Sequence, residues 1–223
     1  MSQAQAKPEQ RVVSHGRFRG LYAVTPDEPD IGLLTRKVRK VLAGGARVLQ
    51  YRNKSANAAQ RREQGAALLA LCRKARVPLV VNDDLDLARA IRADGLHLGR
   101  DDMPIAAARA QLGRDRLLGV SCYDSLELAV AAREAGADYV AFGSAFPSAT
   151  KPAATRAPLS LYREARARLD LSIVAIGGIT TENAHAVIEA GADAVAVISA
   201  LFDAPDIEVA ARSFSRLFDE RNP

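Results

Sequence analysis

The residues EAGADYVAF at 134–142 and EAGADAVAV at 189–197 are close copies of one another. In each copy a glycine stands where a preceding helix has to end, because the residue after a helix often needs a positive φ angle. The aspartate then turns the chain into an apolar run that is too short for a helix and typical of a buried strand. Looser copies lie at 43–46 and 93–95. These copies predict a repeated unit in which a helix, a turn and a strand follow one another.

Short apolar runs of this kind recur along the whole chain. They occur at 21–24, 48–51, 79–81, 95–98, 117–121, 139–142, 173–176 and 194–197. Between them, apolar residues are spaced three and four apart, which predicts helices with one buried stripe. Eight strands alternating with helices indicate parallel strands joined by right-handed crossovers, so we predict the α/β class and a (β/α)8 TIM barrel. An open doubly wound sheet is the alternative, but it usually has fewer strands, and no GxGxxG follows the first strand here.

The length and composition fit one domain of this type. The chain has 223 residues, and 48% of them are hydrophobic, which is enough for one large core. We expect residues 1–19 to form a polar leader, since they lack the apolar centre of a signal peptide, and residues 20–223 to form a single barrel domain. No stretch approaches the roughly 20 apolar residues of a membrane span.

Charge and cysteine content narrow the classes of function. The formal net charge is +5, but the lysines and arginines are scattered, which favours small anionic ligands over nucleic acid. Cys72 and Cys122 are far apart and form no CxxC pair, so we expect neither a disulfide framework nor a zinc site. We therefore expect a cytoplasmic protein that acts on small molecules, with neither nucleic acid nor a membrane as partner. The oligomeric state is left open.

Residues whose side chains can bind ligands or react lie after the predicted strands, where barrel enzymes build their active sites. The run QYRNK at 50–54 ends the second strand. Side chains alternate across a strand, so Gln50, Arg52 and Lys54 point one way and Tyr51 the other. Arginine binds planar oxyanions through its fork, and lysine supplies a movable charge. We interpret this run as an anion site, with phosphate as the expected ligand; the alternative is charged strand ends that face solvent.

Acidic residues follow the third and fourth predicted strands. Asp83 and Asp102 come from neighbouring strand ends, so their carboxylates can converge beside the cations. Two carboxylates next to two or three cations suit a magnesium diphosphate, because the metal takes oxygens from acids and phosphates alike. Helix capping is the alternative. We expect metal binding for Asp83 and Asp102, and capping for Asp84 and Asp101.

A second anion site is indicated after the last two strands. Gly177 and Gly178 follow the seventh predicted strand, and Ile198 and Ser199 follow the eighth. Backbone N–H groups and a helix start often hold a phosphate at this place, and glycine lets the chain approach an anion closely. A simple turn would also explain the two glycines.

Three further features complete the expectations. We expect His97 to be a packed or hydrogen-bonded structural residue, and we do not expect Cys122 to be a nucleophile, because no base is evident beside it. The loop 147–158 has no apolar stripe that can pack into a core. We expect it to be mobile without ligand and to close over the diphosphate, which would bring Lys151 onto the leaving oxygens.

In this order, the motifs resemble those of the thiamine phosphate synthase family, from Leu21 to about Phe202. The motifs are QYRNK at 50–54, ND at 82–83, HLG at 97–99 with Asp102, GVS at 119–121, FG at 142–143 through TK at 150–151, GGI at 177–179 and IS at 198–199. The resemblance implies a transferase that joins 4-amino-2-methyl-5-hydroxymethylpyrimidine diphosphate to 4-methyl-5-(2-phosphoethyl)thiazole. The products would be thiamine phosphate and diphosphate.

The resemblance also implies roles for individual residues. Those that would hold the pyrimidine diphosphate are Gln50, Arg52, Lys54, Asn82, Ser121 and Lys151, with Arg52, Lys54, Ser121 and Lys151 as the catalytic group. Asp83 and Asp102 would bind Mg²⁺. The thiazole phosphate would be held by Ser148, Thr150, Gly178, Ile198 and Ser199. The cations would stabilise the departing diphosphate, and the thiazole nitrogen would attack the methylene carbon, so no protein nucleophile is required.

The chain departs from the usual family pattern at three positions. Tyr51 stands where Leu is common, Arg100 replaces a frequent Gln, and Ser148 replaces a frequent Thr. None of these changes removes a needed group, although Arg100 could alter metal affinity.

Other functions remain open at this point. A thiazole tautomerase shares the barrel family but needs a proton-shuttling residue, often a histidine near the fifth strand, and the run SCY at 121–123 offers none. A non-catalytic barrel that binds phosphorylated metabolites does not need two metal acids. A lyase with a similar phosphate-binding barrel is also possible, and a substrate assay would distinguish it from a synthase.

Overall fold

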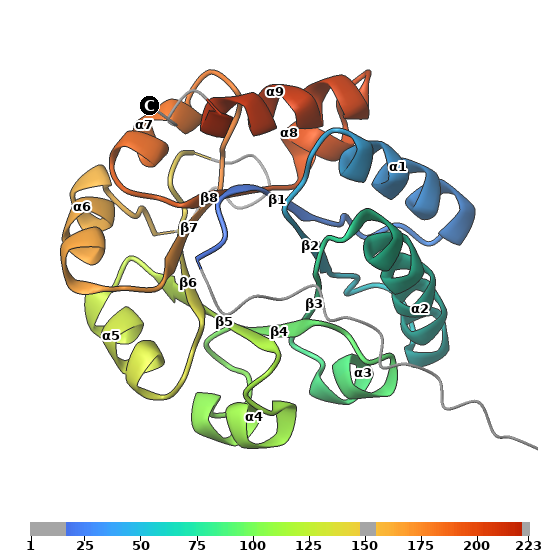
Figure 1. Ribbon diagram of the computed structural model, residues 1–223, viewed down its shortest axis with the longest axis horizontal. Helices are drawn as coiled ribbons and strands as arrows, with labels where there is room; N and C mark the ends of the chain where they lie inside the picture. Colours follow the sequence, from blue (N-terminus) through green and yellow to red (C-terminus); the bar gives the residue numbers. More distant parts are fainter. Residues whose placement is uncertain (1–16, 148–154, 220–223) are drawn as a thin grey trace, which may run out of the picture.

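Eight parallel strands close into a barrel in the computed structural model, with the helices around its outside (Figure 1). The structure describes residues 17–147 and 155–219. The strands are β1 Gly20–Val24, β2 Val48–Tyr51, β3 Leu79–Asn82, β4 Gly95–Leu98, β5 Leu117–Tyr123, β6 Tyr139–Phe142, β7 Ser172–Ile176 and β8 Ala194–Val197. Each strand pairs with its neighbours in sequence, and β8 pairs with β1 to complete the ring. The predicted (β/α)8 TIM barrel is confirmed.

The helices cover the outer face of the barrel. They are α1 Ile31–Ala43, α2 Ala58–Ala75, α3 Leu85–Ala90, α4 Ile105–Leu112, α5 Leu126–Glu134, α6 Leu159–Arg168, α7 Ala184–Glu189, α8 Ser199–Phe202 and α9 Ile207–Asp219. Local sequence explains where several of them begin. Asn57 and Gln60 form a reciprocal capping box at the start of α2. Asp84 caps α3 by accepting a hydrogen bond from the Leu87 N–H, which confirms the capping role predicted for it. The same prediction was wrong for Asp101, because Pro104 precedes α4 and none of the described side chains caps that helix.

The predicted strands agree with the structure to within two residues at each end. The largest difference is in β5, which continues past Ser121 to Tyr123 and changes its register against β6 between these two residues. An irregularity of this kind re-aims the side chains around it and often lies beside an active site. Ser121 therefore stands within a strand, not at its end.

The apolar residues form two layers, one between strands and helices and one inside the barrel. Tyr22 and Tyr139 are fully buried in the inner layer. Phe18 packs on both, with ring centroids 6.0 Å from Tyr22 and 5.2 Å from Tyr139. Its backbone N–H also donates to Ser172 Oγ at 3.0 Å. The contacts of the barrel thus begin before residue 20, and the division at residues 19 and 20 stays a prediction.

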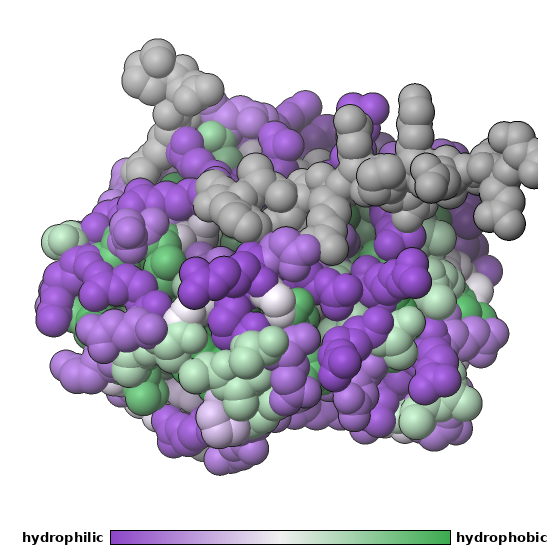
Figure 2. Space-filling view, turned by 60° about the horizontal axis from the view of Figure 1, so that its bottom comes forward, coloured by the Kyte–Doolittle hydropathy of each residue, from purple (hydrophilic) through white to green (hydrophobic). Residues whose placement is uncertain are grey.

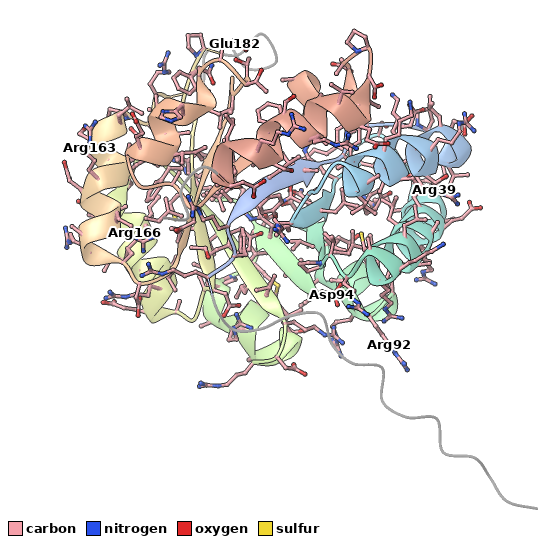
Figure 3. All side chains as sticks on the ribbon, turned by 45° about the horizontal axis from the view of Figure 1, so that its top comes forward. Arg39, Arg92, Asp94, Arg163, Arg166 and Glu182 are labelled. Atoms are coloured by element: carbon pink, nitrogen blue, oxygen red, sulfur yellow. The ribbon has the colours of Figure 1, made fainter. Side chains whose placement is uncertain are left out.

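The aspartates of the repeated unit do more than turn the chain. Each accepts a hydrogen bond from a backbone N–H at the start of the neighbouring strand: Asp94 from Leu79 at 2.9 Å, Asp138 from Leu118 at 2.7 Å and Asp193 from Ile173 at 2.8 Å. Arginine side chains also pair with the carboxylates of Asp138 and Asp193. Arg166 on α6 lies 2.7 Å from Asp193, and Arg109 pairs with Asp138 (Arg166 and Asp94 are labelled in Figure 3). The repeat therefore pins adjacent strands in register.

One face of the molecule can be followed in a space-filling view. Hydrophilic side chains dominate the face shown in Figure 2, with smaller apolar areas between them. Among the helices in the described ranges, none is long and apolar enough to cross a membrane. Cys72 and Cys122 are both buried free thiols. Burial raises the pKa of Cys122 to about 12, which leaves it protonated and agrees with the expectation that it is not a nucleophile.

Candidate active site

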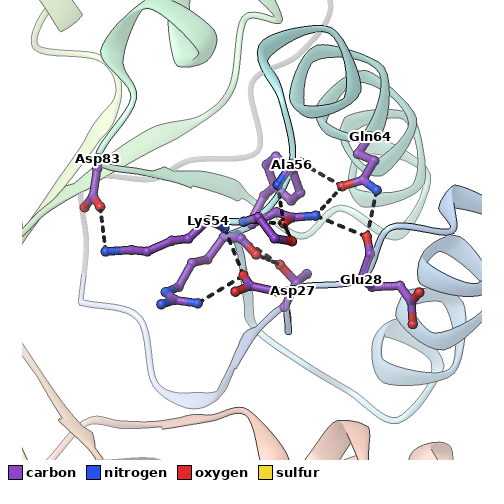
Figure 4. A network of polar contacts seen from close by, with 11 residues as sticks. Asp27, Glu28, Lys54, Ala56, Gln64 and Asp83 are labelled. Carbon is purple, nitrogen blue, oxygen red and sulfur yellow. Dashed lines mark hydrogen bonds and ion pairs between the residues drawn. The ribbon is translucent and has the colours of Figure 1, made fainter.

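The side chains of residues 50–54 alternate as the sequence predicts. Tyr51 points outward, and its hydroxyl donates to Oε1 of Gln64 on α2 at 2.8 Å. Gln50 points into the barrel, where Nε2 donates to the Tyr22 hydroxyl at 3.0 Å. Asn53 joins the outward set by donating to the same Gln64 oxygen at 3.0 Å (Figure 4). The outward residues fasten the strand end to α2, and this leaves the other face for ligands.

Asp27 organises the two cations of this run, and sequence reasoning missed it. Its Oδ1 accepts from the Lys54 backbone N–H at 2.9 Å and lies 3.2 Å from Arg52 Nη1 (Figure 4). Thr25 Oγ1 accepts from the Arg52 N–H and donates to the Arg52 carbonyl, both at 2.9 Å. The loop after β1 therefore orients the end of β2. The only signal in the sequence was an acidic residue shortly after the first strand, a position that capping also explains.

The structure brings Asp83 and Asp102 together. Burial raises the pKa of Asp83, and a hydrogen bond with Asp102 and the charge of that residue raise it further. Lys54 opposes this effect, with Nζ 3.6 Å from Asp83 Oδ2 (Figure 4). Asp83 also has a φ of +63°, which is rare for a residue with a side chain and is found preferentially at functional sites. Asp102 Oδ2 accepts from the Gly99 N–H at 2.6 Å.

This pair of carboxylates fits a divalent cation. Both are hard oxygen donors, and their mutual repulsion is the kind that a bound cation relieves. Residues 17–147 and 155–219 contain no group of three or more His, Cys, Asp or Glu side chains suited to a metal. Mg²⁺ usually takes one or two carboxylates in proteins and fills its other positions with substrate oxygens and water. A cavity of about 190 Å³ next to Asp83 is lined by Lys54 and Asn82 and also by outward-facing residues such as Tyr51 and Asn53, and Asp102 is not part of its lining.

Ser121 lies beside His97. His97 Nε2 is 2.9 Å from Ser121 Oγ, and Nδ1 is 3.0 Å from the Tyr139 hydroxyl, so the expectation of a hydrogen-bonded histidine is confirmed. Burial lowers the pKa of His97 to about 4, and the ring is neutral near pH 7. A histidine thus does stand next to the fifth strand. The sequence of that strand shows none, because His97 comes from β4.

Gly178 allows two loops to touch. Gly177 and Gly178 have φ angles of +98° and +65°, which glycine adopts freely. A Cβ on Gly178 would lie 2.3 Å from the carbonyl oxygen of Pro147 and 2.6 Å from that of Phe146. The close approach to the loop after β6 gives position 178 a structural need for glycine, and its role toward a phosphate stays a prediction. Ser199 is exposed at the start of α8, and Ile198 beside it is half-buried.

The loop between β6 and α6 is only partly described. Ser148, Thr150 and Lys151 lie outside the described residues. Beyond them, Ala157 is buried and its N–H donates to the Ser144 carbonyl at 3.0 Å. The prediction that nothing in this loop packs was therefore wrong for its end, because a small alanine fills the space without an apolar stripe.

Arg100 lies over an aromatic ring. Its guanidinium carbon lies 4.3 Å from the centroid of Tyr123, and its backbone N–H donates to the hydroxyl of that tyrosine at 3.1 Å. A cation over a ring face is a favourable contact. The unusual residue at position 100 therefore has a partner of its own.

Fold and site together define a class: a (β/α)8 barrel with cations and paired carboxylates at the carboxyl end of its strands. The comparison with known proteins narrows this further. The model of the family described as thiamine monophosphate synthase matches residues 21–201. The chain belongs to the thiamine monophosphate synthase family.

Individual relatives agree along nearly their whole length. The chain is 58% identical to thiamine-phosphate synthase of Methylobacillus flagellatus, covering 91% of this chain and 96% of the relative. It is 56% identical to thiamine-phosphate synthase of Chromobacterium violaceum, covering 92% and 99%. Among solved structures, thiamine phosphate pyrophosphorylase from Pyrococcus furiosus superposes with a TM-score of 0.81 at 36% identity, covering 90% of this chain and 96% of that one.

Proposed function

We propose that this chain is a thiamine-phosphate synthase, a transferase that joins the pyrimidine diphosphate to the thiazole phosphate and releases thiamine phosphate and diphosphate. The observation that carries this function is the family match across the barrel, from residue 21 to residue 201. The arrangement of cations and acids at the mouth is compatible with it, because a diphosphate leaves readily only when its charge is neutralised.

On the diphosphate side, Arg52 and Lys54 bind the leaving group, and Asp83 and Asp102 hold Mg²⁺. When bound, the ion neutralises charge on the departing oxygens. Support comes from the ion pair between Lys54 and Asp83, which places a cation at the same spot as the acids. Lys151 is proposed as a third cation from the sequence alone. Asn82, half-buried at the end of β3, contributes an amide to this group.

The two organic parts are held by uncharged groups. Gln50 and Ser121 orient the pyrimidine from inside the barrel. On the other side, the residues proposed for the thiazole phosphate are Ser148, Thr150, Gly178, Ile198 and Ser199. The positive-φ turn at residues 177–178 and the start of α8 support this side by presenting backbone there. Holding both substrates in line converts a bimolecular reaction into an effectively unimolecular one.

The protein is proposed to work in the cytoplasm on small molecules. Both cysteines are buried and reduced in the fold, which suits a reducing compartment.

The direct test is to incubate the purified protein with both substrates and Mg²⁺ and to measure thiamine phosphate. Omission of each substrate and addition of a chelator are the controls. Product is expected only in the complete mixture. A preparation that instead isomerises a thiazole carboxylate phosphate, or that binds both substrates without turnover, would refute the synthase function.

A further inference from the structure

A chain of hydrogen-bonded side chains crosses the inside of the barrel. Gln50 Nε2 lies 3.0 Å from the Tyr22 hydroxyl, which lies 2.7 Å from the Tyr139 hydroxyl. Tyr139 then lies 3.0 Å from His97 Nδ1, and His97 Nε2 lies 2.9 Å from Ser121 Oγ. Both ends are residues proposed above to hold the pyrimidine. The three residues between them have no role in that proposal.

The hydrogen bonds of this series are all donated in the same direction, from Gln50 toward Ser121. An amide nitrogen can only donate, so Gln50 donates to Tyr22. Tyr22 keeps its own proton, because burial raises the pKa of its phenol, and it donates that proton to the Tyr139 oxygen. Burial likewise keeps Tyr139 protonated. The Tyr139 proton is therefore directed at Nδ1 of His97, which must accept it.

The tautomer of His97 determines which partner donates in its hydrogen bond with Ser121. Because Nδ1 accepts the Tyr139 proton, the ring of His97 carries a single proton and is neutral. With Nδ1 as the acceptor, that proton sits on Nε2 and is donated to Ser121 Oγ. Ser121 is half-buried and accepts this bond, so its own hydroxyl proton is left for a ligand. At the other end, the oxygen Oε1 of Gln50 is left as an acceptor.

We propose that Tyr22, Tyr139 and His97 are positioning residues that set Ser121 as a hydrogen-bond donor and Gln50 as an acceptor toward the aminopyrimidine. That ring offers the matching pair, since its exocyclic amine donates and its ring nitrogens accept. The identity of the ligand rests on the proposed function, whereas the proton order rests on the structure of the free protein. Groups ordered before the ligand arrives need no reorientation when it binds.

Ordinary structural pairing of buried hydroxyls is the competing explanation. The surroundings favour positioning instead. The two tyrosines belong to an apolar inner layer that also contains Val24, Val48 and Val80, with Phe18 packed against it. From the tyrosines the hydrogen bonds continue through both ring nitrogens of His97 and end at a half-buried serine, a side chain that a ligand can reach.

The first test is nitrogen-15 NMR of the histidine rings in the free protein near neutral pH. The protein has three histidines, and the signal that is missing from a His97→Gln variant belongs to His97. We expect a neutral ring with the proton on Nε2. A ring protonated on Nδ1 would overturn the proposal, because the order would then run the other way. This result does not depend on which reaction the enzyme catalyses.

The second test is steady-state kinetics of Tyr139→Phe and Tyr22→Phe, with Tyr162→Phe as the matched control. Tyr162 is also fully buried, and its hydroxyl donates to the Phe142 carbonyl at 3.0 Å, away from this chain. We expect the first two variants to lower kcat/KM for the pyrimidine diphosphate about tenfold, as for one lost oriented hydrogen bond, and to leave the KM for the thiazole phosphate unchanged. The control should lose comparable stability and keep both constants.

The outcomes separate the two proposals. Equal kinetic effects in all three tyrosine variants, or none in any of them, would show that these hydrogen bonds serve only the structure. A wild-type protein that makes no thiamine phosphate would refute the proposed function, and the tautomer of His97 would still decide the proton order.

Discussion

Asp83 combines an uncommon backbone conformation with a neighbouring carboxylate, and both are costly to the fold. We expect Asp83→Asn to lower kcat roughly a hundredfold or more, because charge at the proposed metal site is lost. The same change should leave stability unchanged or raise it, since asparagine adopts a φ of +63° readily and does not repel Asp102. Product formation across a range of Mg²⁺ concentrations and thermal unfolding measure the two effects.

The adjacent residue supplies a matched control. Asp84 accepts from the Leu87 N–H at 2.8 Å as the cap of α3, and asparagine caps helices equally well. Asp84→Asn should therefore keep near-normal activity and melting temperature. Normal turnover in Asp83→Asn, or equal losses in both variants, would remove the metal assignment.

Asp27 offers a prediction about a residue that carries no assigned contact with substrate. Asp27→Ala should raise the KM for the pyrimidine diphosphate about tenfold, because the Lys54 N–H and the Arg52 guanidinium lose their common acceptor. Asp27→Asn keeps an acceptor for Lys54 and should have a smaller effect. The KM for the thiazole phosphate serves as the internal reference, and a parallel rise in it would indicate general damage to the barrel.

At the scale of elements, the contact between two loops makes Gly178 a structural residue first. Gly178→Ala should lower the free energy of unfolding by about 2–4 kcal/mol, because a Cβ would meet the Pro147 carbonyl at 2.3 Å and the φ is +65°. Gly32→Ala in α1 is the control, since its Cβ would approach only the side-chain ends of Asp30 and Arg36. Urea unfolding followed by circular dichroism should show a loss for the first variant only.

The proposed phosphate site is better probed at Ser199 than at Gly178. A bulky residue at position 178 should disturb the loop after β6 and weaken the binding of both substrates. Ser199→Ala is the cleaner probe, because Ser199 is exposed and begins a short helix. A selective rise in the KM for the thiazole phosphate is expected from it.

The elements themselves were predictable because local sequence determines them. Strands such as Ala194–Val197 are apolar runs preceded by a glycine and an aspartate, and these signals need no knowledge of the rest of the chain. The pairing of Asp27 with Arg52 and of His97 with Ser121 was not predictable in this way. Each joins side chains from two different units, and only the packing of those units against one another decides whether they meet.

For the molecule as a whole, His97 predicts how stability responds to acid. Its pKa is about 4 in the fold and 6.5 when exposed, so between these values the unfolded chain binds more protons. The contribution of His97 is therefore complete above 6.5 and is lost as the pH falls toward 4, by at most a few kcal/mol. Urea unfolding at pH 7 and pH 5 should show this loss in the wild type and a smaller loss in His97→Gln.

His185 provides the comparison for that measurement. It is exposed on α7, 3.2 Å from Glu189. His185→Gln should therefore preserve the difference between the two pH values. If His97→Gln also preserves it, another group controls the acid response.

The aspartates that pin adjacent strands bear on the order in which the barrel assembles. Asp94, Asp138 and Asp193 each reach a partner only 15 to 20 residues away. Closing so short a loop costs little chain entropy, and contacts between near neighbours form quickly during folding. The pairing of β1 with β8, which joins Leu21 to Val195, has no such advantage. We therefore expect neighbouring units to find their register early and the seam between the two ends of the chain to close last.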